Sequence, residues 1–110
     1  IVVSTQALSV EGQISIPKSY ALKQNYPNPF NPSTQISFDI PVQSDLVTLS
    51  VYNILGQNIH TLVNSALNAG RYTHEWDAND ELGNPVSSGI YFYELRSNNF
   101  VSRKKMLLIR

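Results

Sequence analysis

One short segment near the start of the chain rules out both a helix and an interior strand. It runs Tyr26-Pro27-Asn28-Pro29-Phe30-Asn31-Pro32-Ser33-Thr34 and contains three prolines. Proline fixes φ and lacks a backbone donor, and it restricts the preceding residue to extended conformations. The segment therefore predicts a rigid lead-in to the strands that follow it, which suits a module joined to something upstream.

The rest of the chain alternates apolar and polar residues between turn signals, and helical periodicity is missing. This pattern predicts an all-β fold, an antiparallel β-sandwich of about seven strands. The strands that we expect span residues 34–40, 47–53, 58–63, 71–77, 90–96 and 100–109.

Particular residues in these strands carry further expectations. Both faces of 90–96 are apolar or aromatic, so this strand is expected in the middle of its sheet. Trp76 is expected to be the largest anchor of the core. Gly56 is expected to supply the positive φ of a hairpin turn.

The chain has 110 residues and a formal net charge of zero, which fits one domain with a modest core. Neutrality argues against nucleic acid as a partner, because phosphate binding shows as a basic excess. There is no cysteine, and no run is suited to membrane insertion as a helix. The start, Ile1-Val2-Val3-Ser4, lacks a signal-peptide pattern, so we expect a chain processed from a longer one.

The first residues differ in character from the remainder. We expect residues 1–21 to be a linker, the end of a preceding domain or an extra strand, and residues 22–110 to form the domain. The segment from Ile1 to Val10 is apolar enough to pair with a sheet edge, in its own molecule or in another copy.

Charge is distributed unevenly near the C-terminus. Beyond Glu94 the charged residues are all basic, namely Arg96, Arg103, Lys104, Lys105 and Arg110. On a last strand at a sheet edge, basic side chains discourage edge-to-edge aggregation. A recognition tail is the alternative interpretation of the same residues.

Few residue patterns in the sequence indicate catalysis, and we expect neither an enzyme nor a cofactor. His60 and His74 have no further His or Cys at zinc-ligand spacing, and no Ser, His and acid grouping emerges. Glu75 and Glu94 are too isolated for a glycosidase pair.

One loop carries several oxygen ligands, namely Asp77, Asn79, Asp80 and Glu81. These side chains would suit calcium, but Leu82 stands where an EF-hand needs Gly. Turns stabilised by Asp and Asn side chains explain the same residues more simply.

Five motifs in order, between Leu22 and Arg110, resemble a known family. They are Asn25-Tyr26-Pro27-Asn28-Pro29-Phe30-Asn31-Pro32-Ser33-Thr34, Val51-Tyr52-Asn53-Ile54-Leu55-Gly56-Gln57, Ala69-Gly70 with Trp76-Asp77, Gly83-Asn84-Pro85-Val86-Ser87-Ser88-Gly89-Ile90-Tyr91-Phe92-Tyr93, and Lys104-Lys105-Met106-Leu107-Leu108-Ile109-Arg110. The chain resembles the C-terminal sorting domain of the type IX (Por) secretion system, in a variant similar to the immunoglobulin-like domain of the flagellar hook-capping protein. One departure is Ala78, where the family commonly has Gly.

The resemblance implies an immunoglobulin-like sandwich that directs a larger cargo protein through the periplasm and across the outer membrane, to the cell surface or the medium. The implied partners are an outer-membrane translocon and a sortase-like peptidase. The implied sorting or recognition residues are Pro27, Asn28, Pro29, Phe30, Asn31, Pro32, Gly56, Gly70, Gly89, Tyr91, Lys104, Lys105 and Arg110. Deleting residues 104–110 is then expected to abolish export and to leave most of the sandwich folded.

Two other functions stay open. A subunit of an extracellular filament would add the segment from Ile1 to Val10 as a strand to the next copy. A carbohydrate-binding or adhesive module would need a row of exposed aromatic side chains. The candidates for such a row are Tyr20, Tyr26, Tyr52, Tyr91 and Tyr93.

Overall fold

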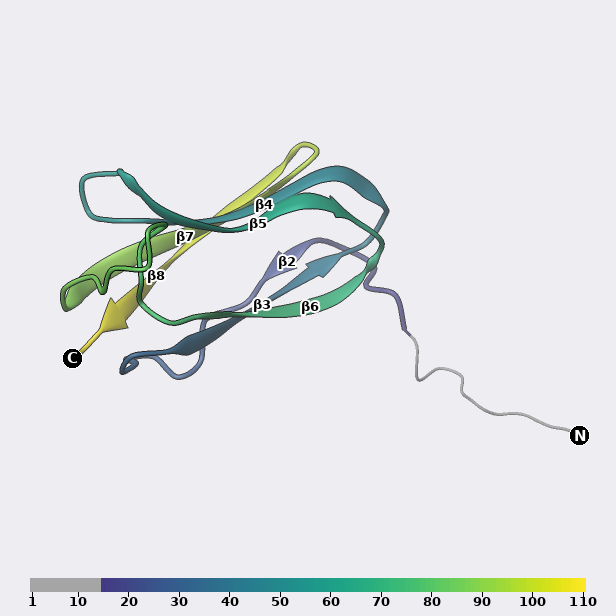
Figure 1. The fold of residues 1–110 in the computed structure, drawn as a ribbon. Coiled ribbons are helices and arrows are strands. Elements are labelled where there is room, and N and C mark those ends of the chain that lie inside the picture. Colours follow the sequence, from purple (N-terminus) through teal and green to yellow (C-terminus); the bar gives the residue numbers. More distant parts are fainter. Residues whose placement is uncertain (1–14) are drawn as a thin grey trace, which may run out of the picture.

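The computed structural model describes residues 15–110, which form seven β-strands (Figure 1). They are β2 (Ala21–Leu22), β3 (Thr34–Ile40), β4 (Ser44–Tyr52), β5 (Asn58–Leu67), β6 (Gly70–Trp76), β7 (Gly89–Ser97) and β8 (Phe100–Leu108). The expected all-β sandwich of about seven strands is confirmed. The strand expected within Ile1 to Val10 lies outside the described residues. In the part of the chain that is described, no helix is long and apolar enough to span a membrane.

The strands form two facing sheets, and every neighbouring pair of strands is antiparallel. One sheet has the order β2-β3-β6, and the other has the order β5-β4-β7-β8. The expected central position of 90–96 is confirmed, because β7 lies between β4 and β8. The edge strands of the larger sheet are β5 and β8, and those of the smaller sheet are β2 and β6.

Two strands extend well beyond the bounds that their sequence patterns predict. β4 begins at Ser44 rather than at residue 47, and β5 continues to Leu67 rather than ending at residue 63. The two extensions pair with each other, since Ser44 lies opposite Leu67 across an irregularity in the register. Asn64, Ser65 and Ala66 are all exposed, so this part of β5 has no apolar alternation that would reveal it.

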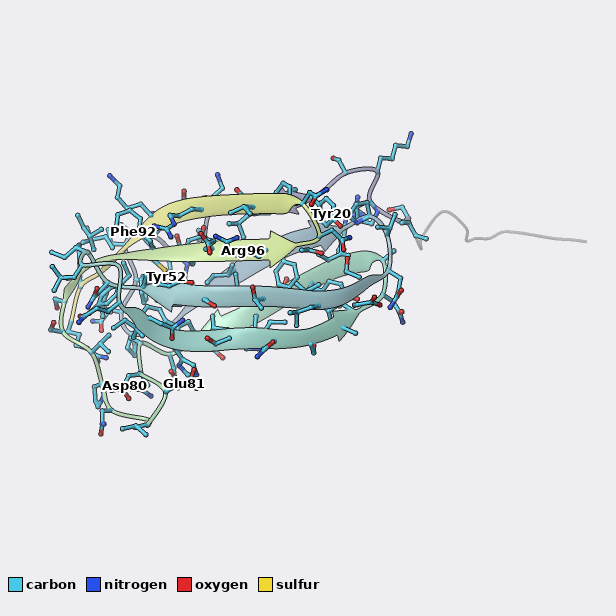
Figure 2. The ribbon with its side chains drawn as sticks, turned by 90° about the horizontal axis from the view of Figure 1, so that it is seen from above. Tyr20, Tyr52, Asp80, Glu81, Phe92 and Arg96 are labelled. Carbon is cyan, nitrogen blue, oxygen red and sulfur yellow. The ribbon has the colours of Figure 1, made fainter. Side chains whose placement is uncertain are left out.

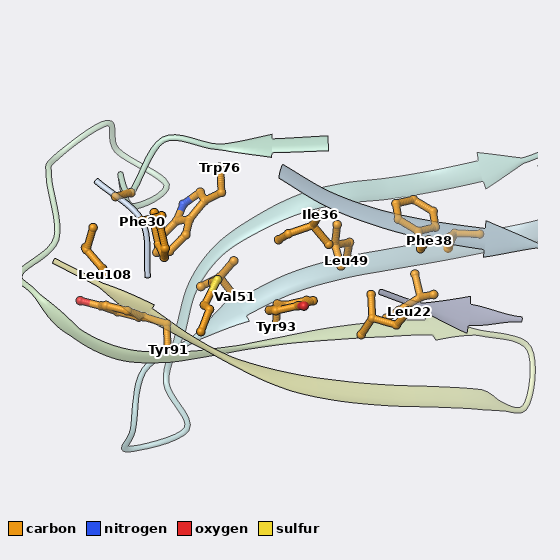
Figure 3. Close-up of a cluster of buried hydrophobic side chains, with 14 of the residues drawn as sticks. Leu22, Phe30, Ile36, Phe38, Leu49, Val51, Trp76, Tyr91, Tyr93 and Leu108 are labelled. Atoms are coloured by element: carbon orange, nitrogen blue, oxygen red, sulfur yellow. The ribbon is translucent and has the colours of Figure 1, made fainter. Parts of the chain in front are cut away.

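The core is built from the inward faces that the alternation predicts. Buried side chains come mainly from β3, β4, β7 and β8, and the expected anchor Trp76 is fully buried. The Trp76 ring lies edge-on to Tyr91 with centroids 5.4 Å apart and is tilted against Phe30 at 5.9 Å (Figure 3). Each fully buried large apolar side chain stabilises the fold by about 1.5–3 kcal/mol, so this layer supplies most of the driving force.

The chain packs onto the sandwich just before β2. Tyr20 stacks on Phe100 with ring centroids 4.8 Å apart, and its hydroxyl accepts a hydrogen bond from Asn98 Nδ2 at 2.8 Å. Hydrogen bonding to Ser44, followed in importance by that to Ser97, lowers the pKa of Tyr20. These contacts fix the point at which the chain enters the domain, at the end of the sandwich opposite to Tyr52 and Phe92 (Figure 2). The boundary expected between residues 21 and 22 stays a prediction.

Candidate recognition site at the C-terminal pole

Most motif residues meet at one end of the sandwich, which we call the C-terminal pole. It comprises the proline segment 26–33 (the strap), the hairpin turn 53–57, the loop 77–88 and the end of β8 with Ile109 and Arg110 (Figure 1). A backbone bridge joins the strap to β8, and Arg110 joins the chain end to the loop 77–88, while the hairpin turn borders a hollow that this loop also lines. The pole therefore brings together motifs that lie far apart in the sequence.

The strap adds a short stretch of pairing to the outer edge of β8. Phe30 N donates to Leu107 O at 3.0 Å, and Ile109 N donates to Phe30 O at 2.9 Å. Asn28 Oδ1 accepts a further hydrogen bond from Leu107 N at 3.0 Å. Because an unpaired sheet edge invites association with other chains, the strap protects the end of this strand.

A second set of hydrogen bonds fixes the start of the strap. Tyr93 Oη accepts from Asn25 N at 2.8 Å and donates to Lys23 O at 2.7 Å. The Asn25 amide Nδ2 donates to Thr34 Oγ1 at 2.9 Å, and Thr34 Oγ1 donates to Pro27 O at 2.8 Å. Burial raises the pKa of Tyr93 to about 12, so its hydroxyl keeps the proton that it donates.

Burial divides the strap residues between two roles. Phe30 is only 2% exposed and belongs to the core, where it packs against Trp76. The other five candidate recognition residues of the strap are exposed, namely Pro27, Asn28, Pro29, Asn31 and Pro32. A partner can therefore contact these five directly, whereas Phe30 acts through the fold.

Arg110 binds the loop 77–88 rather than projecting into solvent. Its Nε donates to Val86 O at 2.6 Å, its Nη2 donates to Ala78 O at 2.9 Å, and its backbone N donates to Ser88 Oγ at 2.8 Å. Ala78 has a φ of 63°, a left-handed conformation that favours glycine. The glycine common at this position in the resembled family suits the same turn.

The candidate calcium ligands are engaged within the fold of their own loop. Asp80 Oδ1 accepts from Leu82 N at 3.0 Å and from Asn84 N at 2.8 Å, and Asp77 Oδ1 accepts from Asn79 N at 3.3 Å. These contacts are the Asx-turn pattern expected as the simpler explanation. Within residues 15–110, no three His, Cys, Asp or Glu residues are grouped so that they could hold a metal ion.

The same loop is attached to the edge of β5. Glu81 Oε2 accepts from Thr61 N at 2.7 Å, and Glu81 N donates to Ile59 O at 3.1 Å. Asn79 O accepts from Trp76 Nε1 at 2.9 Å and lies 2.8 Å from His60 Nδ1. Figure 2 shows Asp80 and Glu81 on this loop, beside the larger sheet. The acidic loop therefore covers the first part of the β5 edge.

Several predicted recognition residues have structural positions or lie away from the pole. Tyr91 is buried and donates to Ser87 O at 2.7 Å, so it supports the loop from inside. Gly70 lies at the opposite end, where β6 begins. Lys104 is paired across the sheet with the buried Tyr93 and is half-buried, whereas Lys105 is exposed. An inward-facing lysine on an edge strand opposes aggregation, which agrees with the first interpretation of the basic end.

Two of the basic residues are held by an acid on the outer face of the larger sheet. Glu94 is 6% exposed, and it bonds to Arg96 Nε at 2.8 Å and to Arg103 Nη2 at 3.1 Å. Arg103 also lies over the Tyr52 ring, 5.2 Å from its centroid. These arginines neutralise a buried carboxylate, so the C-terminal basic residues are not one continuous tail.

The proposed aromatic row does not form from the five tyrosines. Tyr91 and Tyr93 are buried in the core, whereas Tyr26 is 81% exposed on the strap. Tyr20 is stacked on Phe100 at the far end, and Tyr52 lies under Arg103. The alternation of β7 turns its two tyrosines inward, which is why they cannot join a surface platform.

An exposed apolar pair at the tip of the β4–β5 hairpin was missed in the sequence. Ile54 is 70% exposed and Leu55 is 76% exposed. The turn itself is held by Asn53 Oδ1, which accepts from Leu55 N at 2.9 Å and from Gln57 N at 3.0 Å, and by Gly56 with the expected positive φ of 80°. The turn is therefore held without apolar side chains. The presence of two apolar residues in such a turn was the signal available in the sequence.

The pair borders an open hollow of about 450 Å³. Its other apolar lining comes from Ile59, Val86 and Ile90, and Gly89 with a φ of 150° lies at its edge. Exposed apolar groups around a hollow are typical of protein interaction sites. The arrangement can bind an apolar side chain of a partner.

The expectation that most of the sandwich stays folded after deletion of residues 104–110 needs correction. Met106 is 1% exposed and Leu108 is fully buried, and Leu107 and Ile109 bond to the strap. The deletion would remove core side chains and release Phe30, so the sandwich would not stay largely folded. Substitution of exposed residues is the cleaner way to test recognition.

Comparison with known proteins agrees with this architecture. A model of the FlgD Ig-like domain matches residues 25–99. No match is found among the curated proteins. The structure of FlgD from P. aeruginosa is similar, with 25% identity, a TM-score of 0.53 and coverage of 68% of this chain.

Two structures from Porphyromonas gingivalis also share the fold. PorZ, described as an essential bacterial surface component of the type-IX secretion system, has 18% identity and a TM-score of 0.54 over 83% of this chain. Dimeric latent PorU has 20% identity and a TM-score of 0.64 over 92% of this chain. The matches span 57% of the FlgD chain, 11% of PorZ and 10% of PorU.

Proposed function

The chain belongs to the FlgD Ig-like domain family, and from this premise we propose that it is a non-catalytic sorting label for type IX secretion. In this role it directs a larger cargo protein through the periplasm and across the outer membrane, to the cell surface or the medium. The five motifs and the likeness in fold to PorZ support the proposal. Residues 1–21 would then lead from the cargo to the domain.

One observation carries the proposal, namely the exposed apolar hollow at the pole farthest from the chain entry. Ser15, the first described residue, is bonded to Arg71 near the start of β6, at the other end of the sandwich. Cargo upstream of Ser15 would leave the hollow unobstructed. Burial of Ile54 and Leu55 against a partner would contribute up to about 1.5–3 kcal/mol each, enough for selective recognition.

The proposed partners act at different places on the molecule. An outer-membrane translocon would bind the C-terminal pole through the hollow and the exposed strap residues. A sortase-like peptidase would then separate the domain from its cargo upstream of the sandwich. The folded sandwich serves as a rigid carrier, because the strap and Arg110 fix the parts of the pole relative to one another.

An export assay with matched variants tests this proposal. A reporter is fused ahead of the chain in a bacterium that has type IX secretion, and I54D/L55D is compared with V42D/L46D. Val42 and Leu46 are 54% and 55% exposed near the opposite end, so both double variants place two carboxylates on exposed apolar positions.

We expect the tip variant to lower the exported fraction by about ten-fold or more, which corresponds to a loss of at least about 1.4 kcal/mol in binding. The control is expected to export like the unchanged chain. Equal export by the two variants, with both proteins folded, would show that the hollow is not the recognised feature.

The filament subunit is the second candidate, because β5 offers an unpaired edge to a strand from another copy. Light scattering across a dilution series, with and without residues 1–17, separates the two candidates. A monomer in both forms favours the sorting label, whereas assembly that is lost on trimming favours the filament.

A further inference from the structure

The two sides of the sandwich differ, and the side between β5 and β6 is open. β5 is an edge of the larger sheet and β6 is an edge of the smaller one, and the two strands do not pair with each other. A groove of about 330 Å³ lies between them. Its apolar and aromatic lining comes from Phe38, Leu62, Val63, Leu67, Tyr72 and His74.

The backbone along this groove lacks partners. The acidic loop reaches only Ile59, His60 and Thr61 of β5. Among the described residues, none outside β4 forms a hydrogen bond with the backbone of residues 62–67. An apolar groove beside an unpaired strand edge has the two features that bind an extended peptide, since the edge supplies hydrogen bonds and the groove accepts alternate side chains.

We propose that this groove binds the segment from Ile1 to Val10 as an added β-strand. The segment has no charged residue and carries apolar side chains at Leu8 and Val10 with the polar Ser9 between them. An extended strand would therefore place Leu8 and Val10 in the groove and Ser9 on the solvent side. No charge would have to be buried, which would otherwise oppose docking.

The described end of the chain lies within reach of the groove. Arg71 Nη1 donates to Ser15 Oγ at 3.0 Å, and Arg71 directly precedes the groove residue Tyr72. The intervening residues 11–14 span at most about 14 Å when extended. Such a short tether keeps the segment at a local concentration in the millimolar range, so a weak individual affinity suffices for occupancy.

The exchange of backbone amides in the full chain tests the proposal. The variant L8K/V10K places two charges on the face predicted to enter the groove, and S9K places one on the opposite face as a control. In residues 62–67, we expect amides that do not bond to β4 to exchange at least about ten-fold faster in L8K/V10K than in the unchanged chain. S9K is expected to match the unchanged chain.

Equal exchange in the unchanged chain and in L8K/V10K would overturn the proposal. A change confined to residues far from the groove would overturn it as well.

Cross-linking provides a second, independent measurement. The chain has no cysteine, so S9C with S65C can be joined by a short bismaleimide without competing thiols. Ser65 lines the groove, and Ser37 lies on the other sheet, where its hydroxyl is 2.9 Å from that of Thr73. We expect a high yield for S9C/S65C and a low yield for S9C/S37C.

Equal yields would contradict a specific site. Joining of S65C to S65C between two molecules, unchanged by L8K/V10K, would show that a second copy covers the groove through its own edge and would overturn the proposal. The inference does not depend on the sorting function, because neither measurement involves export. A cross-link between two molecules would additionally strengthen the filament candidate.

Discussion

The closed side of the sandwich, formed by β2, the strap and β8, differs from the open side formed by β5 and β6. On the closed side, Tyr93 and Asn28 bond to backbone groups that would otherwise be unpaired. On the open side, residues 62–67 have no such partners among the described residues. The strap motif thus closes the end of one sheet edge at Leu107 to Ile109, whereas the edge of β5 beyond Thr61 is left available for binding.

The two edges also differ in protection against unwanted association. β8 has the strap along its end and Lys104 facing inward. β5 has only the acidic loop over its first residues, bonded through Ile59 and Thr61. An uncovered strand edge can associate with other chains unless another segment pairs with it. This agrees with a docking role for the groove.

The largest expected effect comes from removing the central side chain of the closed side. We expect F30A to lower the free energy of unfolding by about 3–5 kcal/mol, because it leaves a cavity against Trp76. Denaturant unfolding measures this change. Y26A, at an exposed neighbour in the same strap, is the control and is expected to stay within about 0.5 kcal/mol. A small effect of F30A would show that the strap is not part of the core.

The next effect concerns the hydroxyl that fixes the start of the strap. We expect Y93F to cost about 1–3 kcal/mol at neutral pH, because Asn25 N and Lys23 O lose their buried partner. Urea unfolding of Y93F beside the unchanged chain measures the difference.

The raised pKa of Tyr93 predicts that the free energy of unfolding depends on pH. The folded pKa of about 12 lies above the ordinary value of 10. The unfolded state therefore releases the proton first, and the stabilisation is complete below pH 10 and is lost as the pH rises from about 10 to 12. Y93F should lack this loss, so the stability difference between the two proteins should narrow over that interval. A constant difference across the interval would contradict the shifted pKa.

Strands and the central position of β7 could be predicted from the sequence because alternation and turn residues are local signals. The contacts of the C-terminal pole could not. Asn25 meets Tyr93 across 68 residues, and Arg110 meets Ala78 across 32. Such hydrogen bonds depend on how the sheets bring distant residues together, and nothing in the local pattern indicates that Arg110 binds carbonyl groups rather than a partner. The exposure of Ile54 and Leu55 was missed although the two residues stand in a turn, because apolar residues predict burial on average.

A smaller effect is expected on the open side. Leu62 is half-buried against the core at the groove. We expect L62A to cost about 1 kcal/mol, below the range for a fully buried leucine, because its surroundings are partly open. Denaturant unfolding of L62A and F30A in parallel gives the loss in free energy of unfolding on each side of the sandwich. A cost equal to that of F30A would mean that the open side is as tightly packed as the closed one.

The smallest effect separates two asparagines of the same strap. Asn28 Oδ1 accepts from Leu107 N, whereas the side chain of Asn31 forms no hydrogen bond with any described residue. We expect N28A to cost about 0.5–1 kcal/mol and to speed the exchange of the Leu107 amide, while N31A changes neither. Amide exchange and denaturant unfolding of the two variants measure this.

Both residues are exposed and have the same side chain, so intrinsic propensity and solvation are matched and the difference isolates one hydrogen bond. If N28A behaves like N31A, closure of the β8 edge depends on the backbone pairing of Phe30 and on the hydrogen bond from Gln24 Nε2 to Lys105 O. Both asparagines would then be available to a partner that recognises the strap. If only N28A weakens the edge, Asn31 becomes the better position at which to separate recognition from folding, because export can be measured there without a loss of stability.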